Sequence, residues 1–155
     1  MKILFDTCVV VDILGRTSHF ADSYIAYDIA CFKKMDAFLS ASSTTDIVYL
    51  LQSRGFSSRR RAREIACELP ELFDILDNIS EDCRQAAASD MADYEDALIA
   101  YAAARQDIDF VITRNKKDFA HSPVPALTPA EFVALHKPSC LDYAETERDC
   151  WEKDE

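Results

Sequence analysis

The chain has little of what interrupts regular secondary structure: 2 of its 155 residues are glycine and 5 are proline. Long stretches can therefore form helices or strands. No apolar run approaches the roughly 20 residues that a membrane-spanning helix needs. The apolar residues Ile3, Leu4 and Phe5 are followed at once by Asp6, which is unlike a secretory leader. We expect a cytoplasmic protein without a membrane partner.

Cysteine pairs with the spacing of metal ligands are absent. None of the cysteines forms a C-x-x-C pair, which disfavours a zinc site. We interpret them as small, reduced thiols of the core. They are Cys8, Cys31, Cys67, Cys83, Cys140 and Cys150.

Positive charge is scarce, because 17 lysines and arginines stand against 28 aspartates and glutamates. A net charge of −11 repels the phosphates of nucleic acid. Nucleic-acid binding therefore requires bound cations and a local basic patch. The stretch "RGFSSRRRAR" offers such a patch, with Arg54, Arg59, Arg60, Arg61 and Arg63.

Short apolar runs alternate with segments of helical periodicity. Strands are expected at 2–5, 38–42, 72–76, 109–113 and 124–127. Helices are expected between and after them, including 20–38, 44–55, 57–69, 80–89 and 92–105. This alternation predicts an α/β fold, a single domain over residues 1–136 with a central parallel sheet of four or five strands flanked by helices. The acidic C-terminal tail, 137–155, is either mobile or a short helix that docks through Tyr143 and Trp151.

Acidic residues lie near the carboxyl ends of the expected strands or in the helices that follow. Asp6 directly follows the first strand, and Asp118 follows strand 109–113 by five residues. Asp46 and Asp96 fall in the expected first turns of their helices. Because functional groups of an open parallel sheet gather beyond the carboxyl ends of its strands, these four carboxylates can share one crevice.

Such a cluster repels itself unless some acids stay protonated or a divalent cation neutralises them. Oxygen ligands without histidine or cysteine favour Mg²⁺ or Mn²⁺ over zinc. The acids also have simpler interpretations. Asp46, Asp93 and Glu95 can complement the partial positive charge of a helix N-terminus, and Asp118 can cap a short turn. Asp6 is harder to explain in this way, since it follows a buried strand.

Four stretches together resemble the acidic motifs of PIN-domain ribonucleases: "ILFDTCVVVDIL", "SASSTTDIVYLL", "DYEDALIAYAA" and "DFVITRNKKDF". They occur in the family's order and span residues 1–135. The chain looks most like VapC-type toxins of bacterial toxin–antitoxin pairs, in a branch with a "TRNxxDF" motif.

The resemblance implies roles for individual residues. Asp6, Asp96 and Asp118 would be metal ligands, and Asp46 would join them as a catalytic acid where many relatives carry glutamate. Asn115 stands where many relatives carry an aspartate, and Asp118 would supply the missing charge or support the site. Cys8 replaces the asparagine that is common after Asp-Thr. The supporting residues would be Thr7, Asp93, Glu95, Thr113 and Asn115.

The resemblance further implies Mg²⁺- or Mn²⁺-dependent hydrolysis of RNA by water, a homodimer, and an antitoxin whose C-terminal segment covers the acidic crevice. The arginine-rich helix is either a solvated face balanced by Glu64, Glu68 and Glu71 or a phosphate contact next to the site. Its RNA-binding candidates are Arg59, Arg60, Arg61 and Arg63. The alternative function is a PIN-like protein-interaction module with a weakened site, as Asn115 suggests.

Overall fold

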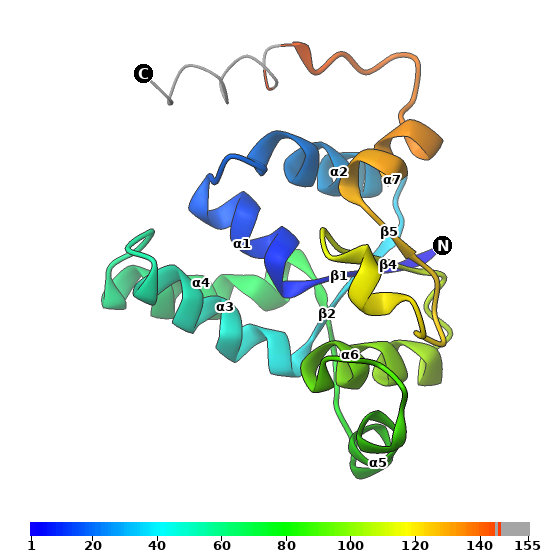
Figure 1. Cartoon of the computed structure of the whole chain (residues 1–155). Coiled ribbons are helices and arrows are strands. Elements are labelled where there is room, and N and C mark those ends of the chain that lie inside the picture. The colour runs from blue at the N-terminus through cyan, green and yellow to red at the C-terminus, as the bar shows by residue number, and fades with distance from the viewer. Residues whose placement is uncertain (145, 147–155) are drawn as a thin grey trace.

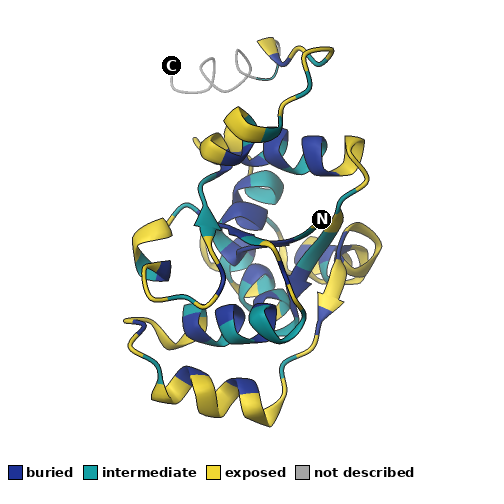
Figure 2. Cartoon of the chain, turned by 90° about the vertical axis from the view of Figure 1, so that its right-hand side faces the viewer, coloured by how far each residue is buried: buried dark blue, intermediate teal, exposed yellow. Residues whose placement is uncertain are grey.

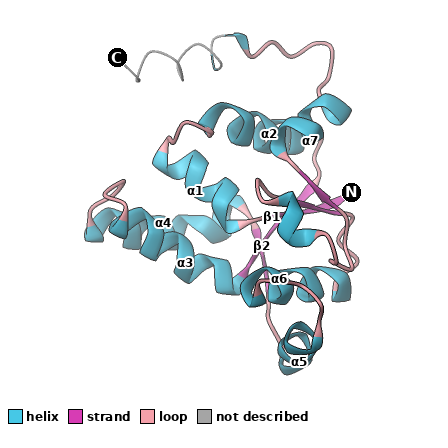
Figure 3. Cartoon of the chain, in the orientation of Figure 1, coloured by secondary structure: helices cyan, strands magenta, loops and turns pink. Residues whose placement is uncertain are grey.

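A parallel sheet of five strands forms the centre of the computed structural model, which describes residues 1–144 and 146 (Figure 3). The strands are β1 (Lys2–Phe5), β2 (Asp36–Ser40), β3 (Asp74–Leu76), β4 (Phe110–Ile112) and β5 (Ala126–Leu127). Their order is β3-β2-β1-β4-β5, and every neighbouring pair is parallel. The predicted single α/β domain with a parallel sheet is confirmed.

Helices cover both faces of this sheet (Figure 1). Ile3 and Phe5 of β1 belong to a core cluster with α1 (Thr7–Gly15), α2 (Phe20–Phe32) and α3 (Ala41–Ser53), whereas Leu4 belongs to a second cluster with α5 (Ser80–Ala88) and α6 (Tyr94–Arg105). This division follows from the two-residue period of a strand. The remaining helices are α4 (Arg59–Leu72), η1 (Lys116–Phe119) and α7 (Pro129–His136). Helices of the fold carry buried residues on one side and exposed residues on the other (Figure 2).

Several predicted boundaries are wrong by a few residues. The helix predicted over 20–38 ends at Phe32, because Lys34 has a φ of 53° and Met35 N–H turns back to the Ala30 carbonyl. The next strand therefore starts at Asp36 rather than at residue 38, and the helix predicted over 44–55 begins at Ala41. The apolar residues of this stretch fit both periods, which short runs often do.

Proline did not stop the arginine-rich helix where the sequence suggested. α4 continues through Pro70 to Leu72. Pro70 lies in the last turn, where its missing N–H removes one backbone hydrogen bond, and the neighbouring Leu69 is 1% exposed.

The interpretation of the cysteines as core thiols is wrong for most of them. Cys31, Cys67, Cys83 and Cys140 are exposed, and Cys8 is half-buried. Each exposed cysteine lies on the outer side of a helix or after α7. The helical periodicity of the surrounding residues therefore indicates their exposure better than the general preference of cysteine for the core. Cys150 lies outside the described residues.

The segment after α7 returns to α2 through Tyr143. The Tyr143 hydroxyl donates a hydrogen bond of 2.6 Å to Asp28 Oδ2, and the Lys137 ammonium lies 5.3 Å from the centre of the Tyr143 ring. Tyr143 is buried, as the docked interpretation of the tail expected, whereas Trp151 lies outside the described residues. Within the described part of the chain, no helix is both long and apolar enough to cross a membrane.

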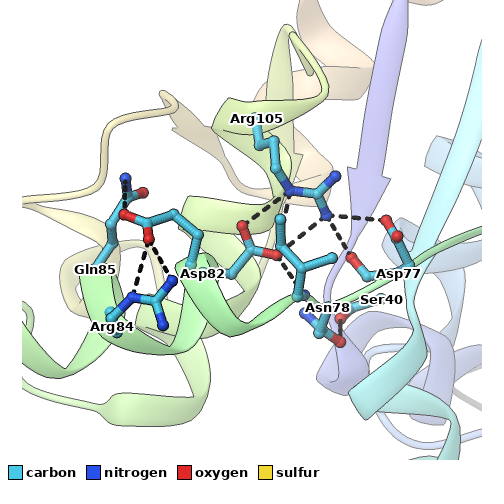
Figure 4. A network of polar contacts seen from close by, with 9 residues as sticks. Ser40, Asp77, Asn78, Asp82, Arg84, Gln85 and Arg105 are labelled. Atoms are coloured by element: carbon cyan, nitrogen blue, oxygen red, sulfur yellow. Dashed lines mark hydrogen bonds and ion pairs between the residues drawn. The ribbon is translucent and has the colours of Figure 1, made fainter.

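The two ends of α6 are anchored differently, and its C-terminal end is held by an ionic network (Figure 4). Arg105 Nε donates to Asp82 Oδ1 at 3.0 Å, and its Nη2 donates to the Asp77 carbonyl at 2.7 Å. Asn78 follows Asp77 in the chain. Its Oδ1 accepts hydrogen bonds from Ser40 Oγ at 3.0 Å and from the Ser42 backbone N–H at 3.1 Å. The network thus connects α6 to the start of α3.

The order of the strands reverses direction between β1 and β4. From β1 the chain adds β2 and β3 on one side, and then β4 and β5 on the other. Phe5 is paired with Ile112, so both strands end at the same level. In open α/β sheets ligands bind beyond the carboxyl ends of the strands at this reversal. The residues that follow Phe5 and Ile112 are therefore the first place to look for a site.

Candidate active site

Asp6 follows β1 and holds its carboxylate against the end of β4. The side chain is 5% exposed, and its Oδ2 accepts hydrogen bonds from Thr113 Oγ1 at 2.7 Å and Cys8 Sγ at 3.0 Å. Its backbone N–H donates to the Ile112 carbonyl at 2.9 Å. Asp6 occupies the N-cap of α1, yet its side chain caps no backbone N–H. Helix capping therefore does not explain this carboxylate.

Thr113 and Thr7 complete the floor of the site. Thr113 is fully buried, and its Oγ1 also accepts the Asn115 backbone N–H at 3.0 Å, which shapes the turn after β4. Thr7 is 6% exposed, and its buried Oγ1 has no hydrogen-bond partner among the described residues. A buried hydroxyl without a partner is costly, so this atom is suited to a ligand or a water molecule.

A cavity of about 230 Å³ opens above Asp6. The first turn of α6, the η1 turn and the C-terminal half of α3 close its sides. Five carboxyl groups and two guanidinium groups line it together with uncharged side chains. The lining residues are Asp6, Thr7, Cys8, Val11, Leu50, Arg54, Asp93, Glu95, Asp96, Arg114, Asn115 and Asp118.

Burial and the excess of acids in this cavity raise the pKa values of several side chains that line it. Burial, and then the charges of Asp6 and Asp93, raise the pKa of Asp96 to about 7. Burial and the nearby Asp46 charge also raise the pKa of Glu95. Burial and the Asp6 charge raise the pKa of the Cys8 thiol to about 12, so it stays protonated and donates to Asp6.

Asp93 has a capping role. Its Oδ1 accepts the backbone N–H groups of Glu95 at 2.8 Å and Asp96 at 3.1 Å, which makes it the N-cap of α6. The cap starts the helix at Tyr94 and so places Asp96 in the first turn, as the sequence predicted. Asp93 supports the site by orienting this turn as well as by its charge.

Asp46 lies in the second turn of α3 rather than the first, because the helix begins at Ala41. It does not line the cavity, but its negative charge is near enough to Glu95 to help raise the pKa of that carboxyl group. Residues four apart share a face of a helix, so Asp46, Leu50 and Arg54 form one stripe. Leu50 and Arg54 of this stripe reach the cavity.

The sequence pattern did not point to the two arginines that line the cavity. Arg54 was counted only in the basic stretch, although its spacing of eight residues from Asp46 could have placed it. Arg114 lies within "TRN", and its Nε is 2.7 Å from Oδ2 of the buried Asp12. The Nε–H does not point at this oxygen, so the contact is an ion pair rather than a hydrogen bond.

The four arginines of α4 separate into two groups. Arg59, Arg60 and Arg63 line an open groove of about 640 Å³ with Glu64 and Cys67. The guanidinium of Arg61 instead binds Glu68, with distances of 2.6 and 2.9 Å.

The carboxylate and amide oxygens that line the cavity are the type of ligand that a hard divalent cation such as Mg²⁺ prefers. The cavity's five carboxyl groups outnumber its two guanidinium groups, and burial, together with the charges of Asp6 and Asp93, raises the pKa of Asp96. Among the described residues, no three acidic, histidine or cysteine side chains are already arranged to hold one ion. Mg²⁺ keeps several water ligands, so it does not require a complete set of protein ligands arranged in advance.

Comparison with known proteins identifies the family. Residues 2–117 match the PIN domain family. No curated protein sequence matches the chain. The VapBC2 structure from Rickettsia felis, bound to a DNA fragment from its promoter, is similar with a TM-score of 0.65 and 14% identity over 83% of this chain and 98% of that one.

Two further solved structures are similar in fold. A toxin–antitoxin complex from Klebsiella pneumoniae has a TM-score of 0.58 and 20% identity over 82% of this chain and 97% of that one. FitAB bound to an IR36 DNA fragment has a TM-score of 0.58 and 21% identity over 82% and 94%. At these identities the likeness shows the fold.

Asp96→Asn should stabilise the metal-free protein above pH 7 and not near pH 4. The pKa of Asp96 is about 7 in the folded chain and near 3.8 without its surroundings, so folding favours the protonated form. The stabilisation by this group is complete below the unfolded pKa and is lost as pH rises through 7. Asparagine cannot ionise and avoids this loss. Thermal unfolding in a chelator measures the change in Tm, and Asp90→Asn, an exposed acid outside the cavity, is the control. An equal change in Tm at both pH values would contradict the assignment.

Proposed function

Because the chain belongs to the PIN domain family, we propose that it is a metal-dependent endoribonuclease and the toxin of a toxin–antitoxin pair. One observation carries the proposal: Asp6, Asp96 and Asp118 come from three separate elements and line the same cavity at the reversal of the strand order. The carboxylates of this cavity repel an RNA phosphate unless a cation is bound between the carboxylates and the phosphate.

Asp6, Asp96 and Asp118 would hold Mg²⁺ or Mn²⁺. Such an ion activates water and offsets negative charge on a phosphodiester under attack. Thr113 and Cys8 keep the Asp6 carboxylate turned toward the cavity. Thr7 Oγ1 is the free hydroxyl beside it, and the Asn115 amide offers a neutral oxygen or N–H group where a fourth acid would otherwise stand.

Asp46 and Glu95 can handle the proton of the reaction. Burial, and then the charge of Asp46, raise the pKa of Glu95. A carboxyl group with a raised pKa exchanges a proton more readily near neutral pH than an ordinary glutamate. In this proposal Asp46 acts through Glu95, since Asp46 itself does not line the cavity.

If the protein is a toxin, it should have protein partners and a defined cellular compartment. The solved structures of similar fold include a toxin–antitoxin complex and VapBC2. By analogy we propose an antitoxin that places an arginine or lysine in the acidic cavity, a homodimer, and a cytoplasmic site of action on RNA. A guanidinium would pair favourably with the carboxylates that otherwise hold the cation.

A non-catalytic interaction module is the second candidate. Asn115 lines the cavity with an amide in place of a carboxylate, and no three metal ligands are arranged in advance among the described residues. In that case the cavity would serve an antitoxin-like partner without hydrolysing RNA.

Metal and RNA measurements on the same variants separate these functions. We expect the wild type to bind Mn²⁺ in calorimetry and to cleave single-stranded RNA only with a divalent cation. Asp6→Asn and Asp96→Asn should each reduce both by at least the roughly 10–100-fold typical of residues that only support metal ligands. Asp90→Asn is the matched control and should behave as the wild type.

Two outcomes would count against the nuclease. If the wild type binds no Mn²⁺, the cation site is wrong. If it binds Mn²⁺ but RNA stays intact, the interaction module is favoured.

The groove of Arg59, Arg60 and Arg63 is proposed to contact RNA phosphates outside the cavity. Replacing all three by glutamine should weaken RNA binding and lower the slope of log Kd against log salt by about 2, at about 0.7 for each lost contact with a single strand. Arg61→Gln is the matched control, because that guanidinium is already paired with Glu68. Anisotropy titrations over a range of salt concentrations measure the slope. If Arg61→Gln alone lowers the slope by about 0.7, the share expected for one groove arginine, the groove has no special role.

A further inference from the structure

A second cavity lies next to the acidic one and shares Arg114 with it. Its volume is about 270 Å³. His19, Asp22 and Ser23 from the start of α2 form one side, and Thr128 and Ala130 from the start of α7 form the other. Because Arg114 lines both cavities, a ligand that crosses this side chain can reach each of them.

A buried carboxylate organises the wall between the cavities. Asp12 is 1% exposed and accepts hydrogen bonds from Thr17 Oγ1 at 2.5 Å and Ser23 Oγ at 3.3 Å. Thr17 Oγ1 in turn accepts the His19 backbone N–H at 3.2 Å. Together with the ion pair to Arg114, these contacts connect the lining residues of the second cavity to α1.

Stability alone does not explain the Asp12–Arg114 ion pair. Removing a carboxylate from water is costly, and a buried ion pair often contributes no more than apolar residues of the same size. The pair does fix a guanidinium at the junction of two cavities. No hydrogen bond from Arg114 Nε to another described residue accompanies the ion pair. The side chain is 30% exposed, so a ligand can reach it.

We propose that Arg114 binds a backbone phosphate of the RNA and that the second cavity holds the nucleotide next to the cleaved bond. The proposal rests on the nuclease function. A guanidinium is well matched to a phosphate, and unstacked RNA bases bind by stacking and by hydrogen bonds to their edges. His19 can stack on a base, and the Asp22 carboxylate can accept from its amino or imino groups.

The size of the cavity agrees with one nucleotide unit. Sites for drug-sized ligands begin at roughly 300 Å³, and this cavity is slightly smaller. A carboxylate at the rim also favours a base with N–H donors over a second phosphate. Asp22 and His19 would then determine which base is accepted beside the cleaved bond.

Photo-crosslinking locates the nucleotide directly. A short single-stranded RNA with one 4-thiouridine, moved along the sequence, is irradiated with the full-length wild type, with Ca²⁺ as the cation. We expect one position of the label to crosslink to the segments 17–23 or 128–130. Arg114→Gln should reduce this crosslink about tenfold or more, the loss expected for one charge-assisted contact. Arg84→Gln, which breaks an ion pair with Glu81 on α5, is the matched control.

A second variant guards against a folding defect, because Arg114→Gln leaves Asp12 without its partner. His19→Ala with Asp22→Asn changes two exposed side chains outside the acidic cavity. This double variant should change the preferred base next to the cleaved bond and leave Mn²⁺ affinity as in the wild type. An unchanged base preference would overturn the proposal.

The outcomes distinguish this proposal from the nuclease function. If RNA is cleaved but no label crosslinks to the second cavity, the subsite is wrong and the nuclease stands. If the label crosslinks there and RNA is never cleaved, the nuclease is wrong and the RNA-binding cavity stands. No crosslink at any position overturns the subsite.

Discussion

The buried Asp6 carboxylate is the constraint on which the rest of the site depends. It lies where the strand order reverses, and a desolvated anion there must keep its hydrogen-bond partners. Those partners come from the end of β4 and from the first turn of α1. The two segments therefore cannot separate without leaving the charge unpaired. This fixes the floor of the acidic cavity before any ligand arrives.

One side wall is positioned by contacts at both ends of α6. Asp93 sets where α6 begins, and the Arg105 network holds the opposite end of that helix against the β3–α5 connection. The carboxyl groups are thus kept close together although they repel one another. Burial first, and then this crowding of like charges, raise the pKa of Asp96. A cation bound among these carboxyl groups would reduce the repulsion between them.

The sequence predicted the position of a site residue well where a local pattern, such as the end of a strand or the start of a helix, marks that residue. Asp6 follows a buried strand directly, and Asp96 follows a capped helix start, so both were placed well. Asp46 was placed one turn too early, because Thr44 and Thr45 are typical cap residues, whereas the helix begins at Ala41. Arg114 and its partner Asp12 are 102 residues apart, from positions 12 and 114, and no local pattern connects them. Such long-range pairs depend on how α1 packs beside the β4 end, which periodicity does not specify.

Diffraction from crystals grown with Mn²⁺ is the most direct test that the acidic cavity is a cation site. Anomalous scattering locates the ion independently of activity. We expect an anomalous peak in the cavity, about 2 Å from oxygens of Asp6 and Asp96. A cavity without a peak at saturating Mn²⁺, or peaks only at surface acids, would contradict it.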